Sequence, residues 1–184
     1  MPQSNTPNVQ PITVSAAPGL TRNMLTTSVT VCQSGTSNCA TIDNIQVDTG
    51  SQGLRILASA LPTSLPLAAV ASGSGVAGEC AVFGGGYTWG AVRGADVRMA
   101  GQLATSIPIQ LIADPTLPNV PTDCAGSGRA MLTVANLRAN GILGVGLFSA
   151  DCGSGCVNSA LPRWYYSCDA SGAASRARKR SRRR

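Results

Sequence analysis

Alternating apolar and polar positions recur along most of the chain and predict β-strands. Residues 24–31 (Met-Leu-Thr-Thr-Ser-Val-Thr-Val) alternate with β-branched side chains, and residues 40–47 have the same pattern. We expect these two runs to form a hairpin. Further strand-like runs lie at residues 54–57, 79–83, 87–98 and 106–113, and we expect residues 142–148 to form a buried strand. The pattern therefore predicts a mostly β protein.

Two segments depart from this alternation. Residues 58–78 are rich in Ala, Pro, Ser and Gly without a clear period, so we expect irregular backbone there. Residues 129–139 carry Met131, Val134 and Leu137 along one side, and Asn140-Gly141 follows as a stop signal. This second segment predicts a short helix near 129–139.

Composition supports a turn-rich β protein rather than a helical bundle. Charged residues make up 12% of the chain and aromatic residues 4%, whereas Gly, Ser, Thr, Ala and Val are abundant. No run of about 18 apolar residues occurs, so we expect no transmembrane segment. Residues 1–18 are polar and contain proline without an apolar stretch, so no signal peptide is expected in this chain.

The basic residues are concentrated at the C-terminal end. The 184-residue chain carries 14 Lys and Arg against 8 Asp and Glu, a net charge of +6. Seven of the basic residues fall within residues 176–184, and the rest of the chain is close to neutral. This tail is expected to be disordered. The predicted organisation is a partly ordered lead-in, a single β lobe and an Arg-rich tail, at residues 1–23, 24–168 and 169–184.

The absence of histidine narrows the chemistry that the chain can carry. Without histidine there is no Ser-His or Cys-His nucleophile pair and no histidine zinc site. The cysteine spacings do not repeat and include no Cys-x-x-Cys pair, which also argues against zinc. We therefore expect no metal and no cofactor, and a carboxylate is the best remaining catalytic group.

Seven cysteines in a chain of this size indicate an oxidising compartment. The predicted disulfide pairs are Cys32–Cys39, Cys80–Cys124 and Cys152–Cys156. The first pair spans a turn-like segment between two predicted strands, and the third encloses Gly-Ser-Gly. The second pair follows by elimination, which leaves Cys168 unpaired.

The strongest functional motif is Asp48-Thr49-Gly50, at the end of a predicted strand. An apolar-apolar-Gly segment, Ile142-Leu143-Gly144, follows about one small domain later. Together they resemble one lobe of a pepsin-like aspartic protease, a family in which the loop carboxylate lies beside a glycine-bearing strand. The resemblance implies a catalytic Asp48, a Thr49 hydroxyl that fixes the loop against a partner lobe, and a Gly50 that permits the tight turn. The alternative is an Asx-type turn without catalytic function.

Aspartic-protease chemistry needs two carboxylates. Two such groups a few ångströms apart share one proton, so that one activates a water while the other hydrogen-bonds the scissile carbonyl. This chain carries one motif of the required kind. The similar string Asp151-Cys152-Gly153-Ser154 lacks a preceding apolar strand and lies in a glycine-rich segment, so we interpret it as a loop.

A further segment resembles the mobile flap that closes over substrate in pepsin-like enzymes. Tyr87 follows three glycines that end at Gly86, and Trp89 lies two residues further on. Flexible glycine beside an aromatic side chain suits a lid. The resemblance predicts flap or substrate-binding roles for Gly86, Tyr87 and Trp89. The alternative is a hairpin tyrosine that packs on Trp89.

A wider set of segments resembles a proteobacterial family of uncharacterised proteins, domain of unknown function 3443. The segments are residues 8–14, 47–57, 87–90, 140–148 and 164–168. The resemblance runs across residues 8–168 and implies a longer exported protein that is periplasmic, secreted or attached to the cell envelope. It also implies a second half with its own Asp-Ser-Gly-like motif.

Three functional hypotheses follow. In the first, the chain is the N-terminal lobe of an exported aspartic-peptidase-like protein, inactive alone because the second aspartate belongs to a missing C-terminal lobe. The Arg-rich tail is then a product of frameshift or truncation. In the second, a homodimer pairs Asp48 with its copy and cleaves peptides. In the third, the lobe is a non-catalytic envelope or binding module. We expect no specific nucleic-acid partner, because the tail lacks interleaved aromatic residues and a basic body.

Overall fold

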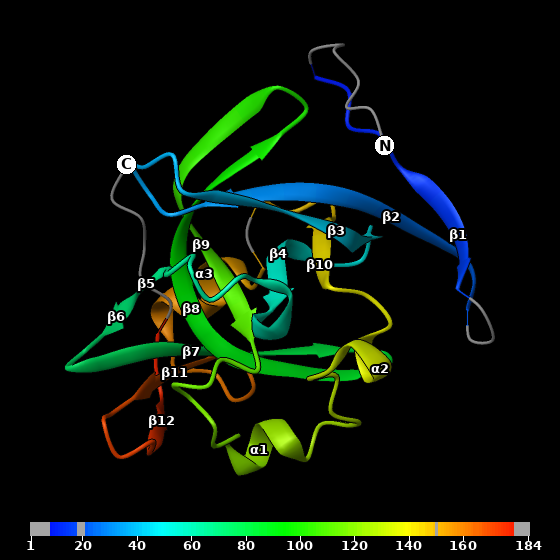
Figure 1. Ribbon diagram of the computed structural model, residues 1–184. Helices are drawn as coiled ribbons and strands as arrows, with labels where there is room; N and C mark the ends of the chain where they lie inside the picture. The colour runs from blue at the N-terminus through cyan, green and yellow to red at the C-terminus, as the bar shows by residue number, and fades with distance from the viewer. Residues whose placement is uncertain (1–7, 18–20, 150, 179–184) are drawn as a thin grey trace.

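The computed structural model describes residues 8–17, 21–149 and 151–178, and its backbone is mostly β, as the sequence predicted (Figure 1). Within these ranges the strands belong to one sheet. The strands are β1 (Thr13–Ala17), β2 (Thr21–Cys32), β3 (Cys39–Asp48), β4 (Gln52–Leu57), β5 (Ala68–Ala69), β6 (Ala71–Ser72), β7 (Gly75–Phe83), β8 (Gly86–Met99), β9 (Gln102–Ile112), β10 (Gly141–Val145), β11 (Tyr165–Cys168) and β12 (Ala174–Arg176). The short helices are η1 (Ala58–Ala60), α1 (Thr122–Ala125), α2 (Val134–Leu137) and α3 (Gly153–Asn158).

The first two alternating runs of the sequence form the β2–β3 hairpin, as expected. Val29 and Val31 face the core and are 1% and 0% exposed. Between them, Thr30 points to the outer face, where its hydroxyl bonds that of Thr41 on β3 at 2.8 Å. Alternation of β-branched apolar and polar residues is what a half-buried strand pair requires.

Strand β10 joins segments that are distant in the chain. It pairs in parallel with β3 on one side and antiparallel with β4 on the other. The sheet then continues from β4 to β9 and from β9 to the long, curved β8. In Figure 1, β10 and β4 lie in the middle of the molecule, below the β2–β3 hairpin. The turn after β3 is therefore held beside the end of β10.

The sheet is completed by strands from both ends of the described chain. At one edge β1, from the predicted lead-in, pairs with β2. At the other edge β11 pairs with β7, and β12 pairs with β11. Residues 174–176, within the segment expected to be a disordered tail, thus form a strand, while residues 179–184 lie outside the described residues. The division into lead-in, lobe and tail stays a prediction.

The helix expected near 129–139 is present but shorter, as α2. The Thr133 hydroxyl caps its start by accepting from the Asn136 N–H at 3.3 Å, and Arg138 ends it in the left-handed conformation with φ 66°. Residues before Thr133 are extended instead, because Ala130 bridges to Tyr87 in β8. In the described ranges no helix is long and apolar enough to cross a bilayer.

Residues 58–78, expected to be irregular, hold η1, β5, β6 and the start of β7. Strand β5 pairs with β8, and β6 pairs with β7. Each of the first three elements is only two or three residues long, so no hydrophobic period can develop within it.

Three clusters of buried side chains stabilise the sheet, and they differ in chemistry. The first is aliphatic and gathers side chains such as Val31 and Ile45 from β2, β3, β4 and β9. The second is aromatic and contains Trp89 and Tyr166, whose rings meet edge to face with centroids 5.4 Å apart. The third, which includes Ile142, joins β10 to α2. Hydrophobic burial on this scale is the main stabilising term of the fold.

Candidate functional site

The Asp48 turn follows β3 directly. The Asp48 carboxylate is partly exposed, and its Oδ1 accepts a hydrogen bond from the Gly50 N–H at 3.0 Å. Thr49 and Gly50 are exposed, and β4 begins two residues later. This is the Asx-type geometry that favours an aspartate before a tight turn. The carboxylate is thus held in a defined position at the surface.

Strand β10 packs directly behind this turn. Gly144 is level with Asp48 of β3 on one side and with Gly53 of β4 on the other. A Cβ atom on Gly144 would lie 2.6 Å from the backbone of Ser51 and Gln52, closer than real Cβ atoms approach. Only glycine therefore fits at this position. The structure brings Asp48 and Gly144 together, as the paired motifs predicted.

The other residues of the second motif are buried or partly buried, whereas the apolar residues that follow it are exposed. Ile142 is 3% exposed in the core, and Leu143, level with Val47, is partly buried. The expectation of a buried strand over residues 142–148 is wrong beyond Gly144, because β10 ends at Val145 and the apolar side chains that follow reach solvent: Leu147 is 98% exposed and Phe148 74%. The segment that follows β10 is thus apolar and exposed to solvent.

The predicted flap residues lie elsewhere, in the core of β8. Tyr87 and Trp89 are 6% and 1% exposed, and the Trp89 indole N–H donates to the Leu117 carbonyl at 3.0 Å. Gly86 is required because a Cβ there would lie 2.0 Å from the Arg129 carbonyl oxygen. The strand registers place Gly90 of β8 level with Leu57, at the opposite end of β4 from the Asp48 turn, and Tyr87 lies three residues beyond Gly90. The structure does not bring these three residues to Asp48.

A second candidate site, which the motifs did not indicate, is a cleft of about 790 Å³. It is lined by β4, β6, β7, β8, β9 and β11 and by residues in and around α3. At its base Arg55 of β4 forms an ion pair with Glu79 of β7 at 2.6 Å, and these side chains are 5% and 7% exposed. The Arg55 guanidinium also donates to the Gln52 carbonyl at 2.7 Å and lies 5.6 Å from the centre of the Phe83 ring. The cleft thus has a buried, charged base.

Burial and the neighbouring carboxylates determine which groups in the cleft are charged. Burial alone favours neutral Arg55, but the adjoining Glu79 carboxylate outweighs it and raises the pKa of Arg55. Across the cleft the Tyr165 hydroxyl donates to the Asp151 carboxylate. Burial first, and then the carboxylates of Glu79 and Asp151, raise the pKa of Tyr165. The guanidinium is charged and the phenol neutral at every physiological pH.

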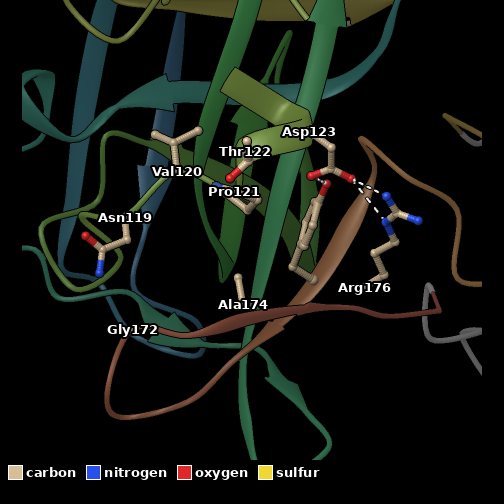
Figure 2. A pocket seen from close by; sticks show the side chains of 9 residues that line it. Asn119, Val120, Pro121, Thr122, Asp123, Gly172, Ala174 and Arg176 are labelled. Atoms are coloured by element: carbon tan, nitrogen blue, oxygen red, sulfur yellow. Dashed lines mark hydrogen bonds and ion pairs between the residues drawn. The ribbon is translucent and has the colours of Figure 1, made fainter. Parts of the chain in front are cut away.

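A smaller cavity of about 440 Å³ lies between α1 and β12 (Figure 2). The Asp123 carboxylate accepts from the Tyr166 hydroxyl at 2.7 Å and pairs with Arg176 at 2.9 Å. Burial opposes the charged form of Asp123, but these two partners outweigh it and lower the pKa of Asp123. Burial and the same hydrogen bond raise the pKa of Tyr166 to about 12. These contacts tie β12 to α1 and position no reactive pair.

The predicted disulfides are all present: Cys32–Cys39, Cys80–Cys124 and Cys152–Cys156. Cys168 is free and buried, and burial, followed by the neighbouring Asp169, raises the pKa of its thiol to about 11. Three disulfides fit an extracellular or periplasmic protein. In the described part of the chain, no group of three or more Cys, Asp or Glu side chains is placed to hold a metal ion.

One signal in the sequence could have revealed the cleft. Arg55 stands between Leu54 and Ile56 in a strand whose last four residues are all buried. A buried charge requires a partner of opposite sign. Four acidic residues lie on strands and could take that role, Asp43, Asp48, Glu79 and Asp96, and only the fold identifies Glu79 among them.

Comparison with known proteins identifies the family. A family model described as protein of unknown function (DUF3443) matches residues 4–183, and the chain belongs to this family. No curated protein matches the chain.

Proposed function

We propose that this chain is one lobe of an aspartic-peptidase-like protein, in which Asp48 supplies one of two catalytic carboxylates. The observation that carries the proposal is the placement of Asp48 on a tight turn, level with Gly144 of a strand held between β3 and β4. Such a turn holds a carboxylate at the surface without neutralising it by an ion pair. The expected site of action is the periplasm or the outside of the cell.

The chemistry requires a second carboxylate that faces Asp48. One member of such a pair, ionised, takes a proton from a water molecule as that water attacks the scissile carbonyl carbon. The other member, protonated, hydrogen-bonds the carbonyl oxygen as negative charge develops there. The hydrogen bond from Gly50 orients the Asp48 carboxylate for either role.

The chain does not offer Asp48 a partner from its own described carboxylates. Glu79, Asp114 and Asp123 are paired with arginines, and Asp151 bonds Tyr165 in the cleft. Asp96 and Asp169 accept hydrogen bonds in turns elsewhere, and Asp43 lies five residues before Asp48 on the same strand. The second carboxylate must therefore come from another lobe or from a second copy of this chain. Alone, the lobe is expected to be inactive.

A homodimer is the second candidate, and one observation favours it. Leu147 and Phe148 are largely exposed just beyond the strand that supports Asp48. Exposed apolar side chains beside a functional residue are typical of a surface that another protein covers. A second copy brought to this surface would place the two Asp48 turns near each other.

The experiment that tests the proposal supplies the second carboxylate from another copy of the chain. Two copies joined by a flexible Gly/Ser linker bring a second Asp48 to an effective concentration in the millimolar range. We expect the linked pair to cleave an unfolded protein substrate at pH 3–6, with inhibition by pepstatin, and the monomeric chain to be inactive. Asp48→Asn in both copies should abolish cleavage.

Two controls sharpen the interpretation. Cleavage by the unlinked chain that rises with the square of its concentration, and is lost with Asp48→Asn, would establish the homodimer. A folded linked pair without any activity would exclude the homodimer. Cleavage that survives Asp48→Asn would overturn the catalytic role of Asp48 in favour of a non-catalytic binding module.

A further inference from the structure

We propose that the cleft above Arg55 and Glu79 binds a neutral, mainly apolar small molecule that carries a carbonyl oxygen. The cleft is separate from the Asp48 turn, because none of Asp48, Thr49 and Gly50 lines it. The inference therefore goes beyond the proposed peptidase-like function and does not depend on it.

The size and walls of the cleft suit a small organic molecule. Its volume of about 790 Å³ lies within the range of ligand sites, roughly 300–1,000 Å³. Its walls are mostly apolar, with contributions from Leu54, Val70, Ala77, Val92, Pro108 and Val157. Such walls favour hydrocarbon over water.

A polar donor at the base has no partner. The Arg55 side chain is 5% exposed, and its Nε atom, fully buried, has no hydrogen-bond acceptor. The two terminal nitrogens are satisfied, by the Gln52 carbonyl and by Glu79. A buried N–H without an acceptor is costly and uncommon. Arg55 lines the cleft, and a small shift of its side chain would bring this enclosed N–H within reach of an acceptor oxygen on a bound molecule.

The balance of charges favours a neutral acceptor. Glu79 and Asp151 line the cleft together with Arg55 and Arg178. Two carboxylates offset the two guanidinium groups, and Glu79 already lies 2.6 Å from Arg55. An anionic ligand at the Arg55 Nε–H would be repelled by that carboxylate. A ketone, ester or amide oxygen accepts the hydrogen bond without this repulsion.

The wall opposite the sheet is fixed by covalent and polar contacts. Gly153, Ser154 and Val157 of α3 line the cleft, and the Cys152–Cys156 disulfide closes the turn that carries them. Asp151, just before α3, accepts the hydrogen bond from Tyr165 of β11. The cleft is therefore largely formed before any ligand enters, which lowers the entropic cost of binding.

The first experiment compares ligands of equal chain length. The native chain is titrated with the neutral fluorescent probe 1-N-phenylnaphthylamine, which is then displaced by 2-octanone, 1-octene or octanoate. We expect 2-octanone to displace the probe at about tenfold lower concentration than 1-octene, the effect of one buried hydrogen bond. Octanoate should be weaker than the ketone. Failure of the native chain to bind the probe, or equal displacement by ketone and alkene, overturns the proposal.

The second experiment locates the site with matched variants. Ala71→Trp places an indole at the cleft wall and should lower probe affinity at least tenfold. Ala69→Trp, two residues away and outside the lining, is the control and should leave it unchanged. Equal binding by these two variants overturns the location.

A third variant examines the proposed hydrogen bond itself. Arg55→Lys keeps the positive charge beside Glu79 but removes the Nε–H. We expect this variant, once circular dichroism shows it folded, to lose the preference for ketone over alkene. Should it not fold, the Ala71→Trp and Ala69→Trp pair still decides whether the cleft is the site.

Discussion

The Asp48 turn and the cleft at Arg55 lie at either side of the start of β4, yet they hold their charges in opposite ways. Asp48 is partly exposed, and its carboxylate accepts a hydrogen bond from the Gly50 N–H, two residues away. Arg55 is buried and is paired with Glu79, 24 residues further along the chain. The first arrangement is local, and the second depends on the assembled sheet.

The difference separates a carboxylate that the fold leaves available from an ion pair on which the fold depends. An exposed carboxylate on a turn costs the fold little and is free to react with a partner. A buried ion pair is costly to break, because removal of one member leaves an uncompensated charge in the interior. Variants at the two places should therefore have effects of very different size on stability and activity.

The largest effect is expected at Arg55. Arg55→Met leaves the Glu79 carboxylate buried at 7% exposure without its partner, and should lower the free energy of unfolding by about 3–5 kcal/mol. Urea denaturation followed by circular dichroism measures this loss. The double variant Arg55→Met/Glu79→Leu is the control, and should be more stable than Arg55→Met alone. A single variant as stable as the native chain would show that the pair does not support the fold.

An intermediate effect is expected at Gly144, which supports the Asp48 turn from behind. Gly144→Ala forces a Cβ against the backbone of Ser51 and Gln52 at 2.6 Å, and should cost about 1–3 kcal/mol by displacing β10 or the turn. Gly84→Ala is the matched control, because nothing lies within 4 Å of a Cβ there. Equal urea midpoints for these two variants would contradict the close approach of β10 to the turn.

The smallest effect on stability is expected at Asp48 itself. Asp48→Asn keeps the side-chain oxygen that accepts from the Gly50 N–H, and should change the free energy of unfolding by no more than about 0.5 kcal/mol. Thermal unfolding at neutral pH provides the measurement. A loss as large as that of Gly144→Ala would mean that the carboxylate supports the fold, and the contrast with Arg55 would fail.

The sequence predicted the parts of the fold that rest on local patterns. The alternation in residues 24–31 and 40–47 corresponds to β2 and β3, because one face of each strand is buried. The disulfide pairs also followed, two of them from short spacings around turns. The helix was overestimated, because residues 129–132 have a helical pattern but pair with β8 through Ala130 instead.

The candidate sites likewise differ in how well local sequence patterns predicted them. The pairing of Asp48 with Gly144 could be anticipated, because two short motifs carry it. Tyr87 and Trp89 were assigned to a flap from their glycine neighbours, whereas both are buried by contacts with segments distant in the chain, Arg129 and Met131 for Tyr87 and Leu117 and Tyr166 for Trp89. At the cleft the sequence offers only the charge of Arg55 within an apolar strand; its partner Glu79 could not be predicted, because the two meet only once β4, β9, β8 and β7 have assembled in order.

The position of Cys168 has a consequence for the lifetime of the disulfides. Exchange between disulfides begins when a thiolate attacks a sulfur atom. Cys168 is 2% exposed and the pKa of its thiol is raised to about 11, so almost none of it is ionised near neutral pH. An odd cysteine is ordinarily a source of scrambled isomers, but this one stays inert for as long as β11 is paired with β7. The pairing of the short strand β11 with β7 thus protects the disulfides from exchange with Cys168.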